Sequence, residues 1–137
     1  MTVTDTIADL IVRVKAGILR RKEIVDLPAS KVKLAIANLL KEEGFINNCE
    51  EIVRGDKKQL RIRLKYGLDQ YGKPKYSAIT DIKRVSRPGC RVYRQVGELN
   101  RLMGGFGAYV ISTSKGLKTD SSARREKLGG EVLLKIW

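Results

Sequence analysis

Residues 59–66 have the sequence Gln-Leu-Arg-Ile-Arg-Leu-Lys-Tyr, in which apolar and cationic side chains alternate. A period of two residues is typical of a β-strand that buries one face. Residues 45–53 precede it across a turn with the pair Gly55-Asp56, which favours an antiparallel hairpin. The cations on its open face are Arg61, Arg63 and Lys65. They fit a solvated face as well as a binding face, because charged runs occur on both.

Two helices are expected before this hairpin. Apolar residues recur at helical spacing over residues 4–21, and Thr4 is the expected N-cap. A short strand at residues 24–27 follows, and Ser30 is then expected to cap a second helix that ends at Gly44. The inner stripe of this second helix would be Val32, Ala35, Ile36, Leu39 and Leu40.

The chain is expected to have two domains. Residues 68–77 are rich in Gly, Pro, Asp and Tyr and show no periodicity, which is typical of a linker. An N-terminal α/β domain would then occupy residues 1–67 and a C-terminal domain residues 78–137. The predicted class is α+β with two small α/β domains, the first ordered α-β-α-β-β and the second mainly β with short helices.

The C-terminal half is expected to begin with two paired strands, at residues 79–85 and 91–96. The pair Pro88-Gly89 between them fits a type II turn. The elements expected after this hairpin are a short helix at 98–103, a strand at 108–111, a polar loop at 112–116, a helix from Thr119 to Lys127 and a final strand at 131–137.

The charge of the chain indicates a polyanionic partner. It carries 28 Lys and Arg against 15 Asp and Glu, a net charge of +13, with a pI near 10.0. Such an excess repels itself unless a polyanion or counterions neutralise it, so nucleic acid is the leading partner and an anionic membrane surface the second. Five cations crowd the expected hairpin of the C-terminal half: Lys83, Arg84, Arg87, Arg91 and Arg94.

Several function classes are excluded or disfavoured by composition. The chain has no histidine, which removes the commonest general base and metal ligand. Cys49 and Cys90 are its only thiols and form no Cys-x-x-Cys pair, so we expect no metal site, no cofactor and a reducing compartment. No stretch is apolar over the roughly 18 residues that span a membrane. We therefore expect a soluble, untargeted protein with no membrane partner.

Two alternative functions, an acyl-enzyme and a membrane binder, each have some support in the sequence. Ser112 and Lys115 have the Ser-x-x-Lys spacing of acyl-enzymes, with Ser112 as nucleophile, but Gly116 interrupts the helix that would bring the two side chains together. A membrane binder would need a basic amphipathic helix, whereas the cations here lie mainly on expected strands and turns.

Three adjacent hydroxyls occur at residues 112–114. They fit two interpretations about equally well: contacts with the base edges and ribose groups of a shallow RNA groove, or an ordinary polar turn.

Longer runs resemble a known family. Residues 83–93, Gly104-Gly105-Phe106-Gly107, residues 111–120 and Gly129-Gly130-Glu131-Val132-Leu133 resemble bacterial-type small-subunit ribosomal protein eight. Residues 4–9, 27–31 and 40–46 match the same family in order, so the similarity covers essentially the whole chain. Cys90 replaces an expected Leu, and residues 125–128 depart from the usual pattern.

The resemblance implies a structural protein, not an enzyme, that binds the central domain of small-subunit rRNA during assembly. Ser112, Thr113 and Ser114 would contact base edges and sugars, Gly116 would allow close approach, and Glu131 would orient the loop. Tyr93 would pack against the RNA. The implied RNA-binding set is completed by Lys83, Arg84, Arg87, Arg91, Lys115 and Arg124, with secondary contacts from Thr4, Arg13, Lys15 and Lys31.

The same resemblance implies the other partners and the location. Neighbouring small-subunit ribosomal proteins would contact the chain, and some bacterial members also bind a stem in their own operon messenger and repress its translation. The expected location is the ribosome in the bacterial cytoplasm, with an organellar ribosome as the alternative.

Overall fold

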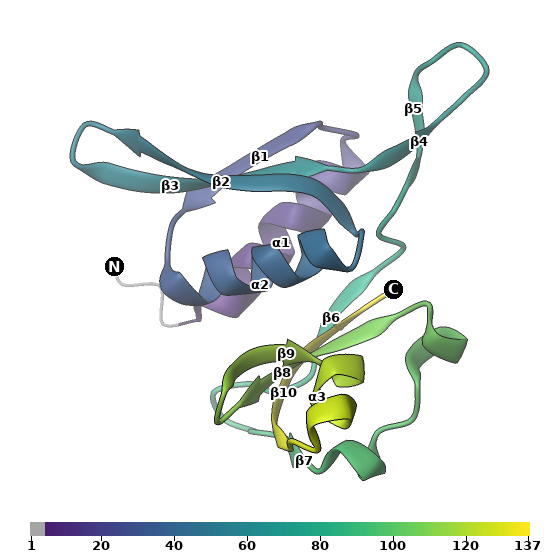
Figure 1. Cartoon of the computed structure of the whole chain (residues 1–137). Helices are drawn as coiled ribbons and strands as arrows, with labels where there is room; N and C mark the ends of the chain where they lie inside the picture. Colours follow the sequence, from purple (N-terminus) through teal and green to yellow (C-terminus); the bar gives the residue numbers. More distant parts are fainter. Residues whose placement is uncertain (1–4) are drawn as a thin grey trace. The chain divides into compact units, whose positions relative to one another are not determined.

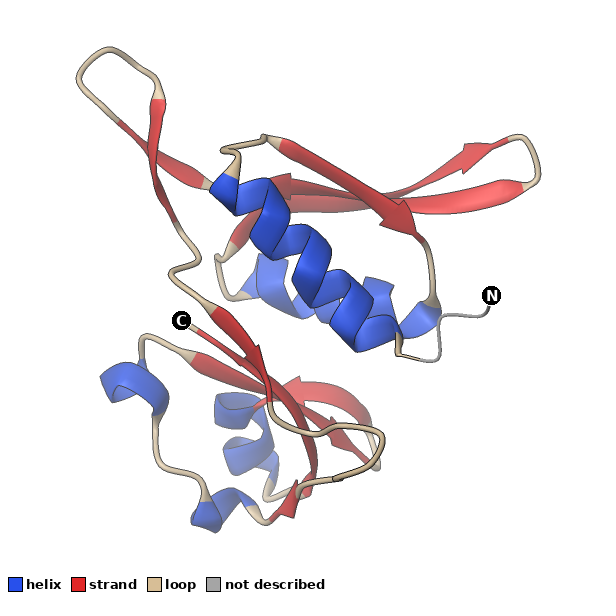
Figure 2. Cartoon of the chain, turned by 180° about the vertical axis from the view of Figure 1, so that it is seen from behind, coloured by secondary structure: helices blue, strands red, loops and turns tan. Residues whose placement is uncertain are grey.

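The computed structural model describes residues 5–137, apart from the side chains of residues 96 and 103. Its contacts divide the chain into two compact units, with the boundary between Thr80 and Asp81. Each unit contains helices and strands (Figure 2), and every strand pairing is antiparallel within the described residues. The structure therefore has the expected α+β class.

The first unit begins with the expected α-β-α-β-β order. Its sheet has the strand order β1-β3-β2, and both helices cover the same face of it (Figure 1). The central strand is the alternating segment, and its apolar face is the one that the helices can cover. The elements are α1 (Thr6–Leu19), β1 (Ile24–Pro28), α2 (Lys31–Glu42), β2 (Ile46–Arg54) and β3 (Lys57–Leu64).

The alternation along β3 divides its side chains as predicted. Its buried residues are Leu60, Ile62 and Leu64. On the other face Arg61 makes a two-point contact with Asp26 of β1, at 2.9 and 3.1 Å. Arg63 lies 3.7 Å from a Glu50 carboxylate oxygen of β2. These two arginines therefore already face carboxylates of neighbouring strands.

The helix ends follow the predicted capping chemistry with one correction. Asp5 caps α1 by accepting a 3.1 Å bond from the Ala8 N–H, whereas Thr4, the expected cap, lies outside the described residues. Ser30 caps α2 as predicted. Gly44 follows this helix with φ +83°, a left-handed conformation that costs glycine little.

The buried face of α2 differs from the expected stripe. Val32 is 40 % exposed, whereas Lys33 is only 3 % exposed. The Lys33 ammonium lies 2.7 Å from a carboxylate oxygen of Asp9 in α1 and 3.0 Å from the Pro28 carbonyl. A buried charge is tolerated when it is paired and hydrogen-bonded. An ion pair between α1 and α2, with a hydrogen bond to β1, therefore lies where apolar packing was expected.

The segment expected as a linker contains a small hairpin. Its strands are β4 (Tyr66–Leu68) and β5 (Pro74–Ser77), which project from the sheet of the first unit (Figure 1). One Asp69 carboxylate oxygen accepts the backbone N–H groups of Tyr71 and Lys73 at 2.8 and 2.9 Å. Each strand is too short for a periodic pattern, which is why composition alone indicated a loop.

The second unit is a sheet built around the last strand. Its strand order is β6-β10-β8-β9, and β7 also pairs with β10. The buried residues Ile111, Ala123 and Val132 form a cluster between this sheet and α3. The elements are β6 (Ile82–Arg84), β7 (Tyr93–Arg94), the 3-10 turns η1 (Val96–Glu98) and η2 (Leu102–Gly105), β8 (Ala108–Thr113), β9 (Gly116–Thr119), α3 (Asp120–Glu126) and β10 (Gly130–Ile136).

Three local expectations in this unit are wrong. β6 and β7 do not pair with each other; both pair with β10, at different points along it. The turn between them closes through mutual backbone bonds of Arg87 and Cys90, but Gly89 lacks the positive φ of a type II turn. Two 3-10 turns replace the helix expected at 98–103. Thr119 does cap α3 as predicted.

Candidate nucleic-acid interface

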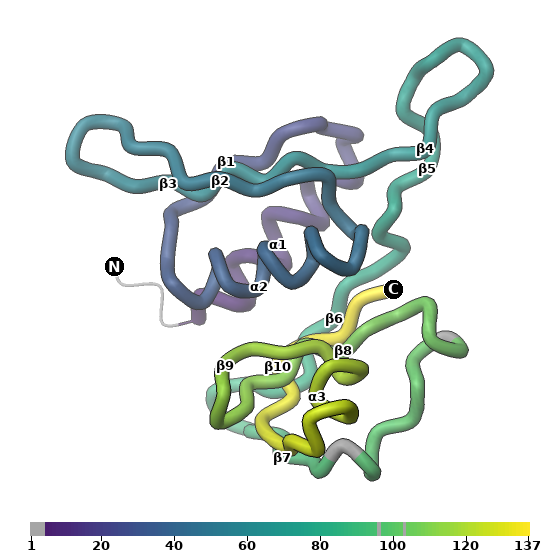
Figure 3. The backbone as a smooth tube through the Cα atoms, in the orientation of Figure 1, coloured from purple at the N-terminus to yellow at the C-terminus, as the bar shows by residue number. Residues whose placement is uncertain are grey.

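The hydroxyl-rich segment forms the tight turn between β8 and β9. Figure 3 follows the chain through this turn into α3. Ser112 and Thr113 end β8, and Gly116 begins β9 opposite Thr113. Gly116 has φ +102°, which other residues rarely adopt, and a Cβ on it would meet nothing within 4 Å. The turn thus exposes bare backbone, where a ligand can approach closely.

The hydroxyls of this turn have different environments. Thr113 Oγ1 donates to the Gly116 carbonyl at 2.7 Å and accepts from the Lys115 N–H at 3.2 Å. Thr113 therefore shapes the turn. Ser112 is half-buried, and Ser114 is exposed at the tip together with Lys115. Ser114 is consequently the hydroxyl best placed to contact a partner.

Glu131 lies between Tyr93 and Ser112 in the sheet. It is paired with Tyr93 on β7 and with Ser112 on β8. Residues directly opposite each other in an antiparallel pair point to the same face. Tyr93, Glu131 and Ser112 therefore share one face on three adjacent strands, although they are far apart in sequence. Tyr93 is 63 % exposed, which disfavours the core role that an aromatic on a strand more often has.

Close backbone packing holds β10 against the end of β8. A Cβ on Gly130 would collide with the carbonyl oxygen of Ser112. Only glycine fits there, and the next residue, Glu131, is then placed opposite Ser112.

A buried serine, which the sequence analysis missed, holds the Glu131 carboxylate. Ser86 has no solvent exposure, and its hydroxyl donates to Glu131 Oε2 at 2.6 Å. The same hydroxyl accepts the Val92 N–H at 3.1 Å. A guanidinium nitrogen of Arg91 lies 3.1 Å from the same carboxylate oxygen. Only its position just before Arg87-Pro88-Gly89 could have drawn attention to Ser86 in the sequence.

The predicted cations of the second unit fall into two groups. Lys83, Arg87, Arg91 and Arg94 are exposed. Arg84 is half-buried and donates to the Ser86 carbonyl at 2.5 Å. Arg124 is also half-buried, between Asp120 at 3.1 Å and the Leu99 carbonyl at 3.0 Å. Arg84 and Arg124 therefore support the local structure. The other four are exposed to a partner, although Arg91 also faces Glu131 and Arg94 faces Glu98.

A groove of about 400 Å³ adjoins this face. It is lined by Tyr93, Arg94, Gln95, Glu98, Gly129 and Gly130. An exposed ring and an arginine at an open groove suit a flat, anionic ligand such as a nucleic acid.

Among the candidate residues described in the first unit, Arg13 adjoins the buried ion pair of Asp9 and Lys33. Arg13 is exposed and lies 2.9 Å from Asp9. Burial alone would raise the pKa of Asp9, but the hydrogen bonds from Lys33 and Arg13 outweigh it and lower that pKa. Lys15 and Lys31 are exposed on α1 and α2. These three cations belong to a different compact unit from the serine turn.

The alternative functions find little support in the geometry. Ser112 ends a strand and Lys115 lies in a turn, so the helical Ser-x-x-Lys arrangement is absent. Among the described residues, no three Cys, Asp or Glu side chains are grouped to hold a metal ion. None of the described helices is long and apolar enough to cross a membrane.

Comparison with known proteins decides the family. The model of the family described as "Ribosomal protein S8" matches residues 5–137. The chain belongs to the ribosomal protein S8 family. Among its relatives, the "Small ribosomal subunit protein uS8" of Caldicellulosiruptor bescii is 52 % identical over 137 residues, all of both chains. That of Alkaliphilus oremlandii is 47 % identical over the same length. The uS8c protein of Rhodomonas salina is 51 % identical over 98 % of this chain and 99 % of its own.

Membership confirms the resemblance seen in the sequence. An S8 protein is a structural constituent of the small ribosomal subunit and not an enzyme, so the acyl-enzyme reading is rejected. The expected location in the ribosome is confirmed, and the relatives include bacterial and organellar proteins.

Proposed function

We propose that this ribosomal protein binds an irregular stem in the central domain of small-subunit rRNA through its C-terminal part, residues 78–137. The observation that carries the proposal is the shared face of Tyr93, Glu131 and Ser112, next to the serine turn and the exposed arginines. Hydroxyls, bare backbone and an aromatic ring suit the minor groove and unstacked bases of a distorted RNA stem.

Affinity and specificity come from different residues in this proposal. Exposed cations such as Arg87 neutralise phosphates, and counterion release makes their contribution depend on salt. Ser114, Gly116 and Tyr93 fix the register of the RNA by contacts that do not depend on charge. In the first unit Arg13, Lys15 and Lys31 add secondary phosphate contacts.

The test is a filter-binding titration of the full chain with the central-domain stem and with a scrambled RNA of equal length, over a salt series. We expect the stem to bind at least about tenfold more tightly, a modest ratio for specific recognition. Arg87→Ala should flatten the salt dependence by about one unit for each lost phosphate contact. Equal affinity for the two RNAs would contradict the proposal.

The proposal extends to a stem in the protein's own operon messenger. A surface that recognises RNA shape and sugar edges does not distinguish two transcripts with the same local structure. We therefore expect a messenger stem of that shape to compete with the rRNA stem, and the competition can be measured in the same assay. Neighbouring small-subunit proteins are the remaining partners in this proposal.

A further inference from the structure

The hairpin of β4 and β5 exposes large apolar side chains in the first unit. Tyr71 is 77 % exposed, and Tyr76 and Leu68 are each 63 % exposed. Together with Arg21 and Lys75 they line a groove of about 580 Å³. We infer that this groove is a second RNA-binding surface, which stacks unpaired bases on Tyr71 and Tyr76 and holds phosphates with Arg21 and Lys75. It goes beyond the proposed function, since it lies in the other compact unit and takes single-stranded RNA.

The ring of Tyr76 is held as a platform. Tyr76 is paired with Gly67 across the hairpin. A Cβ on Gly67 would lie 3.7 Å from Cβ and Cδ2 of Tyr76, so the tyrosine packs beside bare backbone. The Lys75 ammonium lies 5.2 Å from the ring centroid, within cation–π range. A supported, exposed ring next to a cation is the arrangement on which single-stranded bases stack.

The loop that carries Tyr71 is ordered by its own hydrogen bonds. The Asp69 side chain holds two backbone N–H groups. In addition, the Asp69 N–H donates to the Lys73 carbonyl at 2.8 Å, and the Gly72 N–H donates to the Asp69 carbonyl at 3.0 Å. The bonds restrict the loop before any ligand binds, which lowers the entropic cost of association. The bonds from the Tyr71 and Lys73 N–H groups also engage the Asp69 carboxylate, the one acidic side chain among the described residues that line the groove.

Arg21 enters this groove from an unusual backbone conformation. It follows α1 with φ +53°, and the N–H groups of Arg21 and Lys22 bond back to Ile18 and Gly17 at 3.0 and 2.9 Å. This closure normally has glycine at the left-handed position. A non-glycine residue is disfavoured there, and such positions cluster at functional sites. A ligand for the Arg21 side chain would explain why an arginine, and not a glycine, occupies this position.

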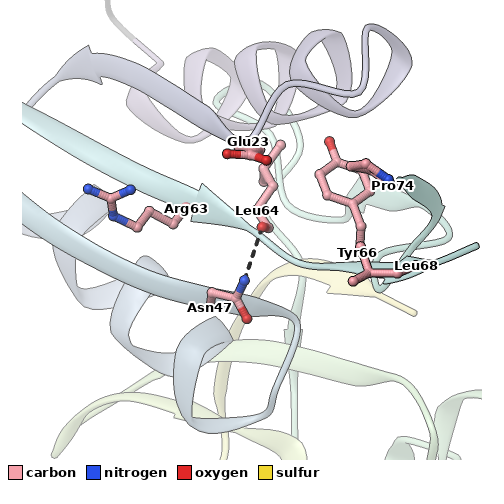
Figure 4. Close-up of a pocket in the computed structure, with 7 residues that line it drawn as sticks. All are labelled: Glu23, Asn47, Arg63, Leu64, Tyr66, Leu68 and Pro74. Atoms are coloured by element: carbon pink, nitrogen blue, oxygen red, sulfur yellow. Dashed lines mark hydrogen bonds between the residues drawn. The ribbon is translucent and has the colours of Figure 1, made fainter. Parts of the chain in front are cut away.

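A direct bond joins the hairpin to this basic turn. The Tyr66 hydroxyl donates to the Lys22 carbonyl at 2.7 Å. Figure 4 shows Tyr66, Leu68 and Pro74 grouped on the hairpin side of a neighbouring pocket, with Glu23 on the opposite side. The bond fixes the base of the hairpin to the residue after Arg21, so the rings and the arginine belong to one surface.

The observations favour RNA over an acidic protein segment. Both partners would satisfy Arg21 and Lys75, but exposed flat rings in an open groove of this size match a nucleobase, whose faces stack on aromatics regardless of sequence. An acidic peptide lacks such faces, and its binding would depend on the charges alone. The role of the rings therefore distinguishes the two partners.

The test uses the full chain and a short single-stranded poly(A) RNA, followed by fluorescence anisotropy and by NMR of the tyrosine rings. We expect the Tyr76 and Tyr71 ring signals to shift on titration. Tyr76→Leu should weaken binding at least about fivefold, the lower limit for the loss of one stacked base. Tyr76→Phe should retain the affinity, because the ring remains. Preserved β4–β5 backbone shifts in each variant would show that the hairpin is intact.

A matched pair of variants tests Arg21 without disturbing the hairpin. Arg21→Gly removes a cation and places glycine at a left-handed position, so folding should be retained. Lys127→Gly makes the same change at a second non-glycine residue with positive φ, at the end of α3. We expect weaker poly(A) binding for Arg21→Gly than for Lys127→Gly. Equal losses for the two variants would overturn the role of Arg21.

Other outcomes would overturn the inference as a whole. The surface is not an RNA site if the Tyr76 and Tyr71 ring signals stay unchanged on titration with poly(A). It is also not an RNA site if an oligoglutamate peptide displaces poly(A) and Tyr76→Leu weakens the binding of the peptide as much as that of poly(A). Ser114→Ala should leave these ring shifts intact. A negative result with poly(A) would therefore contradict only the RNA site on the β4–β5 hairpin. Stem recognition by the second unit is tested independently by the filter-binding assay.

Discussion

The Ser86 hydroxyl donates a 2.6 Å hydrogen bond to Oε2 of Glu131, 45 residues away in the sequence. Ser86 lies two residues after β6, and Glu131 lies on β10 between Tyr93 and Ser112. This side-chain bond connects the start of the second unit to the middle of the candidate RNA face. Because the serine is fully buried, it can act on RNA only through the groups that it holds, Glu131 and the backbone at Val92.

Replacement of Ser86 by alanine should weaken both folding and RNA binding. The Glu131 carboxylate and the Val92 N–H each lose a partner, and an unsatisfied polar group costs about 1–3 kcal/mol when buried. We expect a lower free energy of unfolding in urea and weaker stem binding, with an unchanged salt dependence. Ser121→Ala, at an exposed position of α3, is the control. Wild-type affinity in Ser86→Ala well below its melting temperature would show that Glu131 needs no such support.

The local chemistry of the fold could be predicted from the sequence. Alternation from Leu60 to Leu64 identified a strand and its buried face, because a period of two is a property of the strand itself. Ser30 and Thr119 cap helices as predicted, because a cap bonds to backbone only three residues away. The exposed backbone at Gly116 could likewise be predicted, because glycine has no side chain to cover it.

Contacts between distant residues could not be predicted in the same way. Lys33 interrupts an apolar pattern, and only its pairing with Asp9, 24 residues earlier, explains its burial. Ser86 has no helical or strand pattern that marks it. Tyr93 and Ser112 lie opposite Glu131 because β10 pairs with β7 on one edge and with β8 on the other. The residue types do not specify which strands pair or in which register.

Ser114→Ala should reduce specificity with little effect on folding. The side chain is exposed at the tip of the β8–β9 turn, so its loss leaves no buried group without a partner. We expect stem binding to weaken by about 1–3 kcal/mol while the salt dependence stays constant. Filter binding with the stem and the scrambled RNA measures both effects. If the two RNAs lose affinity equally, the hydroxyl does not take part in recognition.

Lys33→Ala should destabilise the first unit. It removes the ammonium that faces Asp9 and Pro28 inside the helical layer. We expect a loss of about 3 kcal/mol, the low end for breaking a buried pair, because Asp9 keeps its bond to Arg13. Urea denaturation followed by circular dichroism measures the change. Lys31→Ala, two residues earlier and exposed, should stay close to wild type, and a similar loss there would contradict the importance of the pair.

Acid should destabilise the chain partly through Asp26. The hydrogen bonds from Arg61, opposed in part by burial, lower the pKa of Asp26 below its ordinary value of 3.8. The unfolded chain therefore binds a proton at a higher pH than the folded chain does. The stabilisation is complete above the unfolded pKa and is lost as the pH falls through the folded pKa.

Asp26→Asn tests this pH dependence, because asparagine cannot ionise. We expect lower stability than wild type at neutral pH and a smaller loss of stability as the pH falls below about 4, the range in which the aspartate takes up its proton. Urea denaturation over a pH series measures the slope. Arg61→Gln removes the cause of the lowered pKa and should flatten the profile similarly, and the double variant should add little. Full additivity of the two changes would show that the Arg61–Asp26 contact is not the source of the acid sensitivity.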